Sequence, residues 1–173
     1  MAAKKRKKKR GRGREARKRL FRDHARHTKE HLPPSSEIRF EPKGQAKMSN
    51  VLKDFAEPYA ELADTERGLR VLFQVAMVAW NTALAPEEER EALLEETITR
   101  GFGHASEDVQ ASMREILDEM VQRKLALFDV YKRFIVSVEV KRTKGTDHLS
   151  VISMPGASAP GVETPGPPGK EQT

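Results

Sequence analysis

The chain has 173 residues, of which 37% are apolar and 34% charged; its formal net charge is +6, and it has no cysteine. This length suits one ordinary domain with tails, and the composition indicates that part of the chain does not fold. The lack of cysteine excludes disulfides, thiolate catalysis and cysteine-ligated zinc. The most apolar window, residues 69–85, is too short and too polar to span a membrane. We therefore expect a soluble protein in the cytoplasm, or in the nucleus if the source is eukaryotic.

Basic charge is concentrated at the N-terminal end. Residues 1–47 carry 18 Lys and Arg against 5 Asp and Glu, whereas residues 48–154 carry 13 against 19. The seven consecutive Lys and Arg residues that begin at Lys4 repel one another and bury nothing. Residues 14–31 hold only two large apolar residues, so we expect at most a nascent helix there. We predict a disordered basic arm and linker over 1–47, a folded domain over 48–154, and a disordered tail rich in Pro and Gly over 155–173.

Four helices are predicted in the domain. The first begins near Met48, and Pro58 either kinks it or begins a second short helix. The second follows an N-cap at Asp64 or Thr65 and is apolar on almost every side up to about Leu84, which predicts a central helix. The inward residues predicted for the first helix recur at helical spacing: Val51, Leu52, Phe55, Tyr59 and Leu62.

The third and fourth helices are separated by a glycine turn. The third begins at Pro86, with glutamates in its first turn that suit the positive end of the helix dipole. Residues 101–103, Gly-Phe-Gly, end it and form a turn. Ser106 then caps the fourth helix, which carries a continuous apolar stripe to about Phe128.

After the fourth helix, the apolar period changes from helical to alternating. Residues 134, 136, 138 and 140 are apolar and share one face of a strand, and a second strand over 147–153 follows a turn. A hairpin of two strands is barely stable alone, so we expect its apolar face to pack on the helices. The predicted fold class is therefore α+β and mostly α, a four-helix domain with a C-terminal β-hairpin flanked by disordered tails.

The composition of the arm is typical of a protein that binds nucleic acid. Lys and Arg at this density neutralise phosphates and release counterions, which gives binding that depends on salt and not on sequence. Disordered segments rich in Arg can fold on RNA, so we favour RNA or the ribosome over specific DNA. The predicted nucleic-acid-binding residues are Lys4, Lys5, Arg6, Lys7, Lys8, Lys9, Arg10, Arg12, Arg14, Arg17, Lys18, Arg19, Arg22 and Arg26. The alternative is a protein–protein interaction module whose basic tail serves only solubility or targeting, since the run also matches a nuclear-import signal.

Three other polar clusters suggest sites, and each has a simpler explanation. His24, His27 and His31 would share one side of a helix, but the surrounding Lys and Arg would repel a metal ion, so no metal or cofactor is predicted. Residues 147–150 include Asp, His and Ser, which alternate along one strand and do not converge as a triad would. The glutamates of 87–96 form a solvated face or dock the arm within the same molecule. We predict no catalytic residue and expect a non-enzymatic accessory protein.

Overall fold

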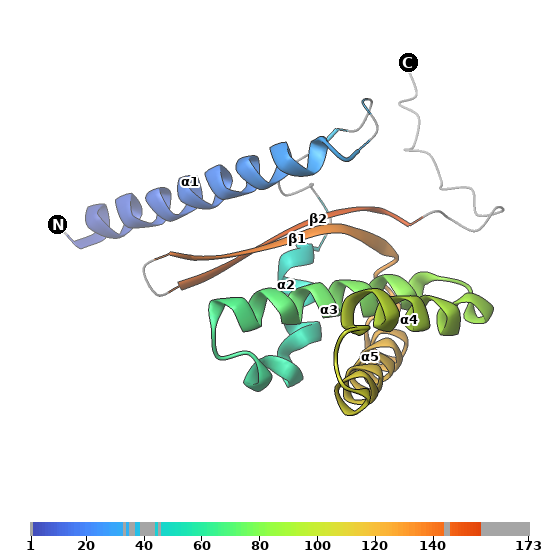
Figure 1. Ribbon diagram of the computed structural model, residues 1–173. Helices are drawn as coiled ribbons and strands as arrows, with labels where there is room; N and C mark the ends of the chain where they lie inside the picture. Colours follow the sequence, from blue (N-terminus) through green and yellow to red (C-terminus); the bar gives the residue numbers. More distant parts are fainter. Residues whose placement is uncertain are drawn as a thin grey trace, which may run out of the picture.

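The computed structural model describes residues 2–32, 34, 37–38, 44, 46–143 and 146–156, and of residues 2–14, 16 and 143 it describes the backbone alone. These residues form α1 (Ala2–Lys29), α2 (Met48–Ala56), the 3₁₀-helix η1 (Glu57–Leu62), α3 (Glu66–Leu84), α4 (Glu87–Phe102), α5 (Glu107–Leu127) and the antiparallel strands β1 (Arg133–Thr143) and β2 (Thr146–Pro155). Figure 1 shows three layers, because α1 lies along one face of the hairpin while α2 to α5 lie on the other side. None of the helices in the described part of the chain has the length and apolar character that a membrane-spanning helix requires.

The mostly helical fold with a C-terminal hairpin is confirmed, but the number of helices is not. The described residues form five α-helices where four were predicted. The additional helix is α1, which occupies a segment predicted to be at most a nascent helix. The prediction assumed that this segment has no apolar face with which to pack on other elements. In the structure, polar side chains attach it to the hairpin. The predicted tail from residue 157 onward and most of the predicted linker lie outside the described residues.

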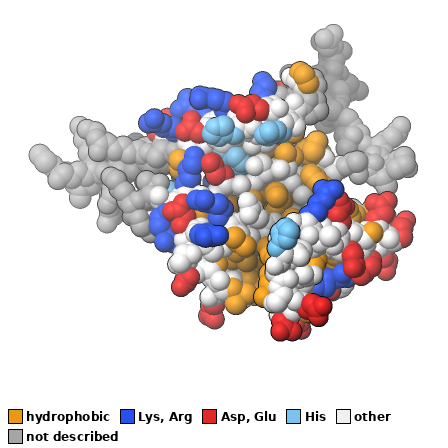
Figure 2. Space-filling model, viewed as in Figure 1, with side chains coloured by type: hydrophobic (Ala, Val, Ile, Leu, Met, Phe, Trp, Pro, Cys, Tyr) orange, Lys and Arg blue, Asp and Glu red, His pale blue; other side chains and the backbone are white. Residues whose placement is uncertain are grey.

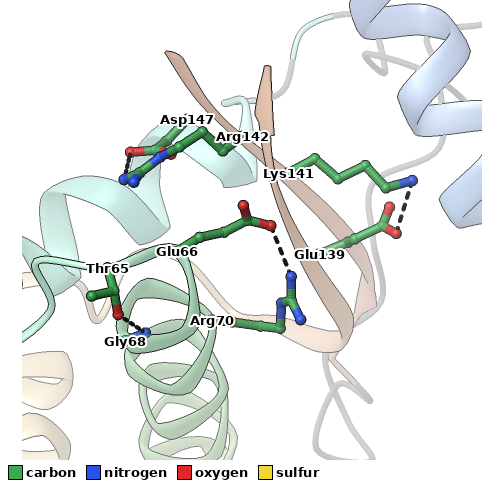
Figure 3. A network of polar contacts seen from close by, with 8 residues as sticks. All are labelled: Thr65, Glu66, Gly68, Arg70, Glu139, Lys141, Arg142 and Asp147. Atoms are coloured by element: carbon green, nitrogen blue, oxygen red, sulfur yellow. Dashed lines mark hydrogen bonds and ion pairs between the residues drawn. The ribbon is translucent and has the colours of Figure 1, made fainter. Parts of the chain in front are cut away.

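The central position of α3 follows from its apolar sequence. Thr65 caps it by accepting a hydrogen bond from the Gly68 backbone N–H at 2.9 Å, as one of the two predicted caps (Figure 3). Trp80, near its end, is fully buried and packs with Phe55 of α2 and Phe128 after α5, with ring centroids 5.4 to 6.0 Å apart. The three rings join the helices into one core.

The first predicted helix divides at Pro58. This proline lies in the first turn of η1, which follows α2 directly, so the second of the two predicted alternatives is confirmed. Val51, Leu52 and Phe55 are buried in the core as predicted. Leu62 is 70% exposed, so its predicted inward position is wrong. The tighter 3₁₀ geometry of η1 rotates its last residues away from the face that a continuous α-helix would present.

A β-bulge at Val136 changes the predicted faces of β1. Ile135 pairs with Ser153 and Ser137 pairs with Ile152, so Val136 is an extra residue in β1. Ile135 therefore faces the core, and Phe134 is 42% exposed, which reverses the predicted placement of these two residues. Beyond the bulge, the predicted alternation holds.

Two side chains of α3 hold β1 at this bulge. Asn81 donates from Nδ2 to the Ile135 carbonyl at 2.8 Å and accepts from the Ile135 backbone N–H at 2.9 Å. Trp80 donates from its indole N–H to the Arg133 carbonyl at 2.8 Å. These three bonds satisfy backbone groups that the two-stranded ladder leaves free on this edge of β1. The bulge is thus fixed from outside the sheet.

Lys124 is a buried cation at the end of α5. Its side chain is almost inaccessible, and its Nζ donates to the Phe128 carbonyl at 2.9 Å and lies 4.6 Å from the centre of the Trp80 ring. Burial lowers the pKa of Lys124 to about 8, because the charged ammonium loses its hydration. The hydrogen bond satisfies a carbonyl at the helix end, and the ring face attracts the charge.

Candidate nucleic-acid interface

Helix α1 is attached to the hairpin by a polar contact. His24 is buried between α1 and the hairpin, with its Nδ1 2.9 Å from Ser150 Oγ on β2 and its Nε2 2.7 Å from Ser137 Oγ on β1. A neutral imidazole has one donor and one acceptor nitrogen, so one hydroxyl accepts and the other donates. Thr28, one turn later, is also buried and donates to the His24 carbonyl at 3.0 Å. We call these four residues the α1–hairpin joint.

An isoleucine lies beside this joint. Ile152 pairs with Ser137 across the hairpin, so the two side chains share the face on which His24 sits. Ile152 is 5% exposed, although it is not part of the main hydrophobic core on the other side of the sheet. The layer formed by α1 accounts for this burial, and it gives the joint an apolar neighbour.

Burial of His24 in the joint disfavours its protonated form. Burial lowers the pKa of His24, and Lys141 and His27 act in the same direction, while Glu139 opposes them. Glu139 forms an ion pair through Oε1 with Lys141 Nζ at 3.0 Å (Figure 3). Its other oxygen, Oε2, is buried and has no hydrogen-bond partner among the described residues. The contact between α1 and the hairpin is therefore polar, and one buried acceptor near it, Glu139 Oε2, has no hydrogen-bond partner among the described residues.

The face of α1 opposite the joint carries a row of exposed cations. Arg19, Arg22, Arg26 and Lys29 are separated by three, four and three residues, which places them on one side of the helix. We call these four residues the basic stripe; they cover roughly 15 Å at 1.5 Å per residue. Figure 2 shows Lys and Arg side chains gathered at the top of the view, where α1 lies, and Asp and Glu side chains gathered at the lower right, over α4 and α5.

The predicted nucleic-acid-binding residues fall into two groups along α1. The side chains from Lys4 to Arg14 lie outside the described residues, although their backbone is helical. Arg17, Arg19, Arg22 and Arg26 are exposed. Lys18, in contrast, is half-buried and lies 3.5 Å from a carboxylate oxygen of Glu15. The structure thus presents four of the five predicted residues with described side chains to solvent.

The histidine cluster noted in the sequence has a different arrangement. His24 is bound to two serines, whereas His27 and His31 are exposed. In the described part of the chain, no group of three or more His, Asp and Glu side chains is placed to hold a metal ion. The Asp, His and Ser of residues 147–150 do not converge either, because Asp147 pairs with Arg142 at 2.7 Å while the serine binds His24.

The acidic residues of α4 are bound to the neighbouring helix. Arg114 of α5 donates to Glu91 at 2.5 Å and to Asp118 at 2.9 Å, and it lies 3.7 Å from Glu95. This network joins α4 to α5. Helix α1 instead contacts β2, and Figure 1 shows it on the other side of the hairpin from α4.

Sequence reasoning missed the residues that hold α1. In the sequence, His24 suggested a site only as one of three histidines, and Ser150 only as part of the Asp-His-Ser cluster of residues 147–150. Ser137 was predicted only to lie on one face of the first strand. Hydrophobic periodicity cannot reveal a contact made by polar side chains. The alternation of β1 and β2 does place both serines on the face away from the main core, which was the one signal that something polar could pack there.

Helix α1 has exposed basic residues on one face, and its opposite face is bound to the hairpin. Helices and hairpins occur in many unrelated proteins, so these elements do not identify a function by themselves. Function has to be argued from the charges and contacts of the site. Compared with protein-family models, curated proteins and solved structures, the chain matches none of them.

Proposed function

We propose that this protein binds nucleic acid through α1 and that it is an accessory protein and not an enzyme. The observation that carries the proposal is the basic stripe, which is exposed along α1 directly opposite the α1–hairpin joint. Exposed Lys and Arg side chains neutralise phosphates, and each contact releases a counterion. The remainder of the protein is acidic, so its field does not compete with that of α1 for the polyanion.

The helical state of α1 bears on which nucleic acid is bound. The preference for RNA or the ribosome rested on a disordered arm that folds on its target. A helix that is already formed and held on the hairpin removes that reason. The phosphate-binding chemistry is unchanged, so the proposal covers nucleic acid in general.

Charge-neutralising variants test the proposal. We expect a triple variant of the basic stripe, R19Q/R22Q/R26Q, to weaken binding to a generic nucleic acid. Each lost phosphate contact should reduce the slope of log K against log salt by about 0.9 for duplex DNA or about 0.7 for a single strand. The slope should therefore fall by about 2 to 3, as measured by fluorescence anisotropy between low and physiological salt.

A matched control separates the position of the charges from their number. Lys53, Arg67 and Arg100 are exposed on α2, α3 and α4, so the triple variant K53Q/R67Q/R100Q loses the same net charge away from α1. We expect this control to keep the wild-type slope. Equal slopes for the two triple variants would contradict the proposal, because net charge alone would then explain the binding.

A second candidate function is a protein–protein interaction module, with the basic helix serving solubility or targeting. The observation in its favour is an apolar cluster at the open end of the hairpin. Phe134 and Met154 pair across the strands and are 42% and 48% exposed, and Val130 before β1 is 83% exposed. A purified partner that binds with defined stoichiometry after nuclease treatment, and that F134S releases while R19Q/R22Q/R26Q does not, would favour this function.

A further inference from the structure

Helix α1 is longer than the surface that holds it. Ser150, which binds His24, is four residues from Thr146, the first residue of β2, so the strand continues for only about 13 Å beyond the joint. The 22 residues from Ala2 to Asp23 extend roughly 33 Å at 1.5 Å per residue. Figure 1 shows the N-terminal turns of α1 reaching past the ends of the strands. About the first half of α1 therefore projects from the protein as a helical rod.

Basic residues occupy consecutive positions in the sequence of the projecting half. Positions 4–10 are all Lys or Arg, and positions 12 and 14 are Arg. At 3.6 residues per turn, seven consecutive positions pass almost twice around the helix axis. The docked half is different, because there the exposed cations of the basic stripe lie opposite the joint. A rod that is basic on all sides suits a partner whose negative charges surround it, whereas a flat anionic surface would use one side only.

We infer that the partner of α1 is double-helical DNA, and that the projecting half of α1 binds in its major groove. This inference rests on the proposed function. The major groove of B-form DNA is about 12 Å wide and has a row of phosphates along each side, and an α-helix with its side chains is about 10–12 Å across. The major groove of A-form RNA is too narrow for such a helix. The cations of the rod then meet phosphates on both sides.

The other residues of α1 argue against a single-stranded partner and against contacts that read adenine. Proteins that bind single strands stack the bases on aromatic side chains. Phe21 is the only Phe, Tyr or Trp of α1, and it is half-buried in the docked half. Helix α1 also contains no Asn or Gln, the residues that pair with adenine in the major groove. The inferred binding is therefore carried by the phosphates of a duplex, and Arg contacts with guanine are the only base contacts that its composition favours.

Comparing nucleic acids of one sequence tests the inference. Fluorescence anisotropy of the full chain would be measured with a 20-base-pair DNA duplex, the RNA duplex of the same sequence, and each single strand, all at the same salt concentration. We expect the DNA duplex to bind at least tenfold more tightly than the others. Equal or tighter binding of the RNA duplex or a single strand overturns the inference but leaves the proposed function intact. No binding to any of them overturns both.

Two substitutions at one position isolate the helical form from the charge. Gly11 lies within the projecting half of α1, so G11P breaks the helix there and G11A strengthens it, while both keep every basic residue. We expect G11P to weaken binding to the DNA duplex about tenfold and to leave single-strand binding within twofold, whereas G11A binds the duplex at least as well as the wild type. Circular dichroism would verify the change in helix content. Equal duplex affinities of G11P and G11A would overturn the inference.

Discussion

Replacing His24 by alanine tests the α1–hairpin joint most directly. The substitution removes the contacts with Ser137 and Ser150 and leaves both hydroxyls without the imidazole. A hydrogen bond between neutral groups contributes about 0.5–1.5 kcal/mol, and the space vacated by a buried ring adds a cavity cost. We therefore expect H24A to weaken the docking of α1 by about 2–3 kcal/mol.

Hydrogen exchange of the α1 backbone amides measures this docking locally. A helix held at one polar contact opens without unfolding the core, so its exchange reports the docking free energy. A loss of about 2–3 kcal/mol corresponds to exchange that is roughly 30- to 150-fold faster, at about 1.4 kcal/mol per factor of ten. The amides of α3 should keep their protection, because α3 packs on the opposite face of the hairpin.

H27A is the matched control for this experiment. His27 lies on the same helix and is exposed, so its replacement removes an imidazole without touching either serine. We expect its α1 exchange to stay close to that of the wild type. Equal acceleration in H24A and H27A would refute the joint as described. A double-mutant cycle between His24 and Ser137 should give a coupling energy of about 1 kcal/mol, and a value near zero would contradict the hydrogen bond.

Three further outcomes follow from the structure. Docking of α1 should weaken as the pH falls below 6.5, because the pKa of His24 is lowered in the docked state and the undocked state therefore takes up the proton first. Hydrogen exchange of the α1 amides at pH 7 and pH 5, corrected for intrinsic rates, should show this pH dependence, and the variant H24N should lack it. The free energy of unfolding should rise between about pH 8 and 10.5, because the unfolded chain still holds the proton that Lys124 has lost in the folded protein. K124M should flatten this rise and add about 1–3 kcal/mol to the free energy of unfolding at pH 7, as measured by urea denaturation. N81A leaves the Ile135 backbone groups unpaired and should lower the free energy of unfolding, measured in urea, by about 2–3 kcal/mol. A stability equal to that of the wild type would show that the bulge does not depend on Asn81.

The parts of the fold that sequence predicted are those built on apolar periodicity. The stripe of α5, the all-round apolar surface of α3 and the alternation of β2 each indicate a buried face. The structure buries most of these residues at least in part, although Val71 of α3 and Val109 of α5 are 45% and 46% exposed. Caps and breakers located the ends of these elements, as with Thr65 before α3 and Pro58 in η1. Burial of apolar area is the dominant stabilising contribution, so a pattern that records it is informative.

Polar contacts between distant residues account for what sequence did not predict. The bulge at Val136 depends on Asn81, which lies 54 residues before Ile135, and a strand pattern cannot reveal such a partner. Helix α1 depends on His24 and two serines, none of which contributes to an apolar stripe. The prediction of at most a nascent helix in residues 14–31 followed from the composition, but it omitted the surface that the hairpin supplies.

The position of the joint along the chain sets the order in which the protein is completed. The serines that hold His24 lie 113 and 126 residues after it, on the last two elements of the fold. At roughly 5–20 residues per second, a ribosome needs roughly 6–25 s to pass from His24 to Ser150. Helix α1 is thus synthesised before both strands of the hairpin, and it is fixed only after they have been made. A chain that stops before β2 has no place to dock its basic helix.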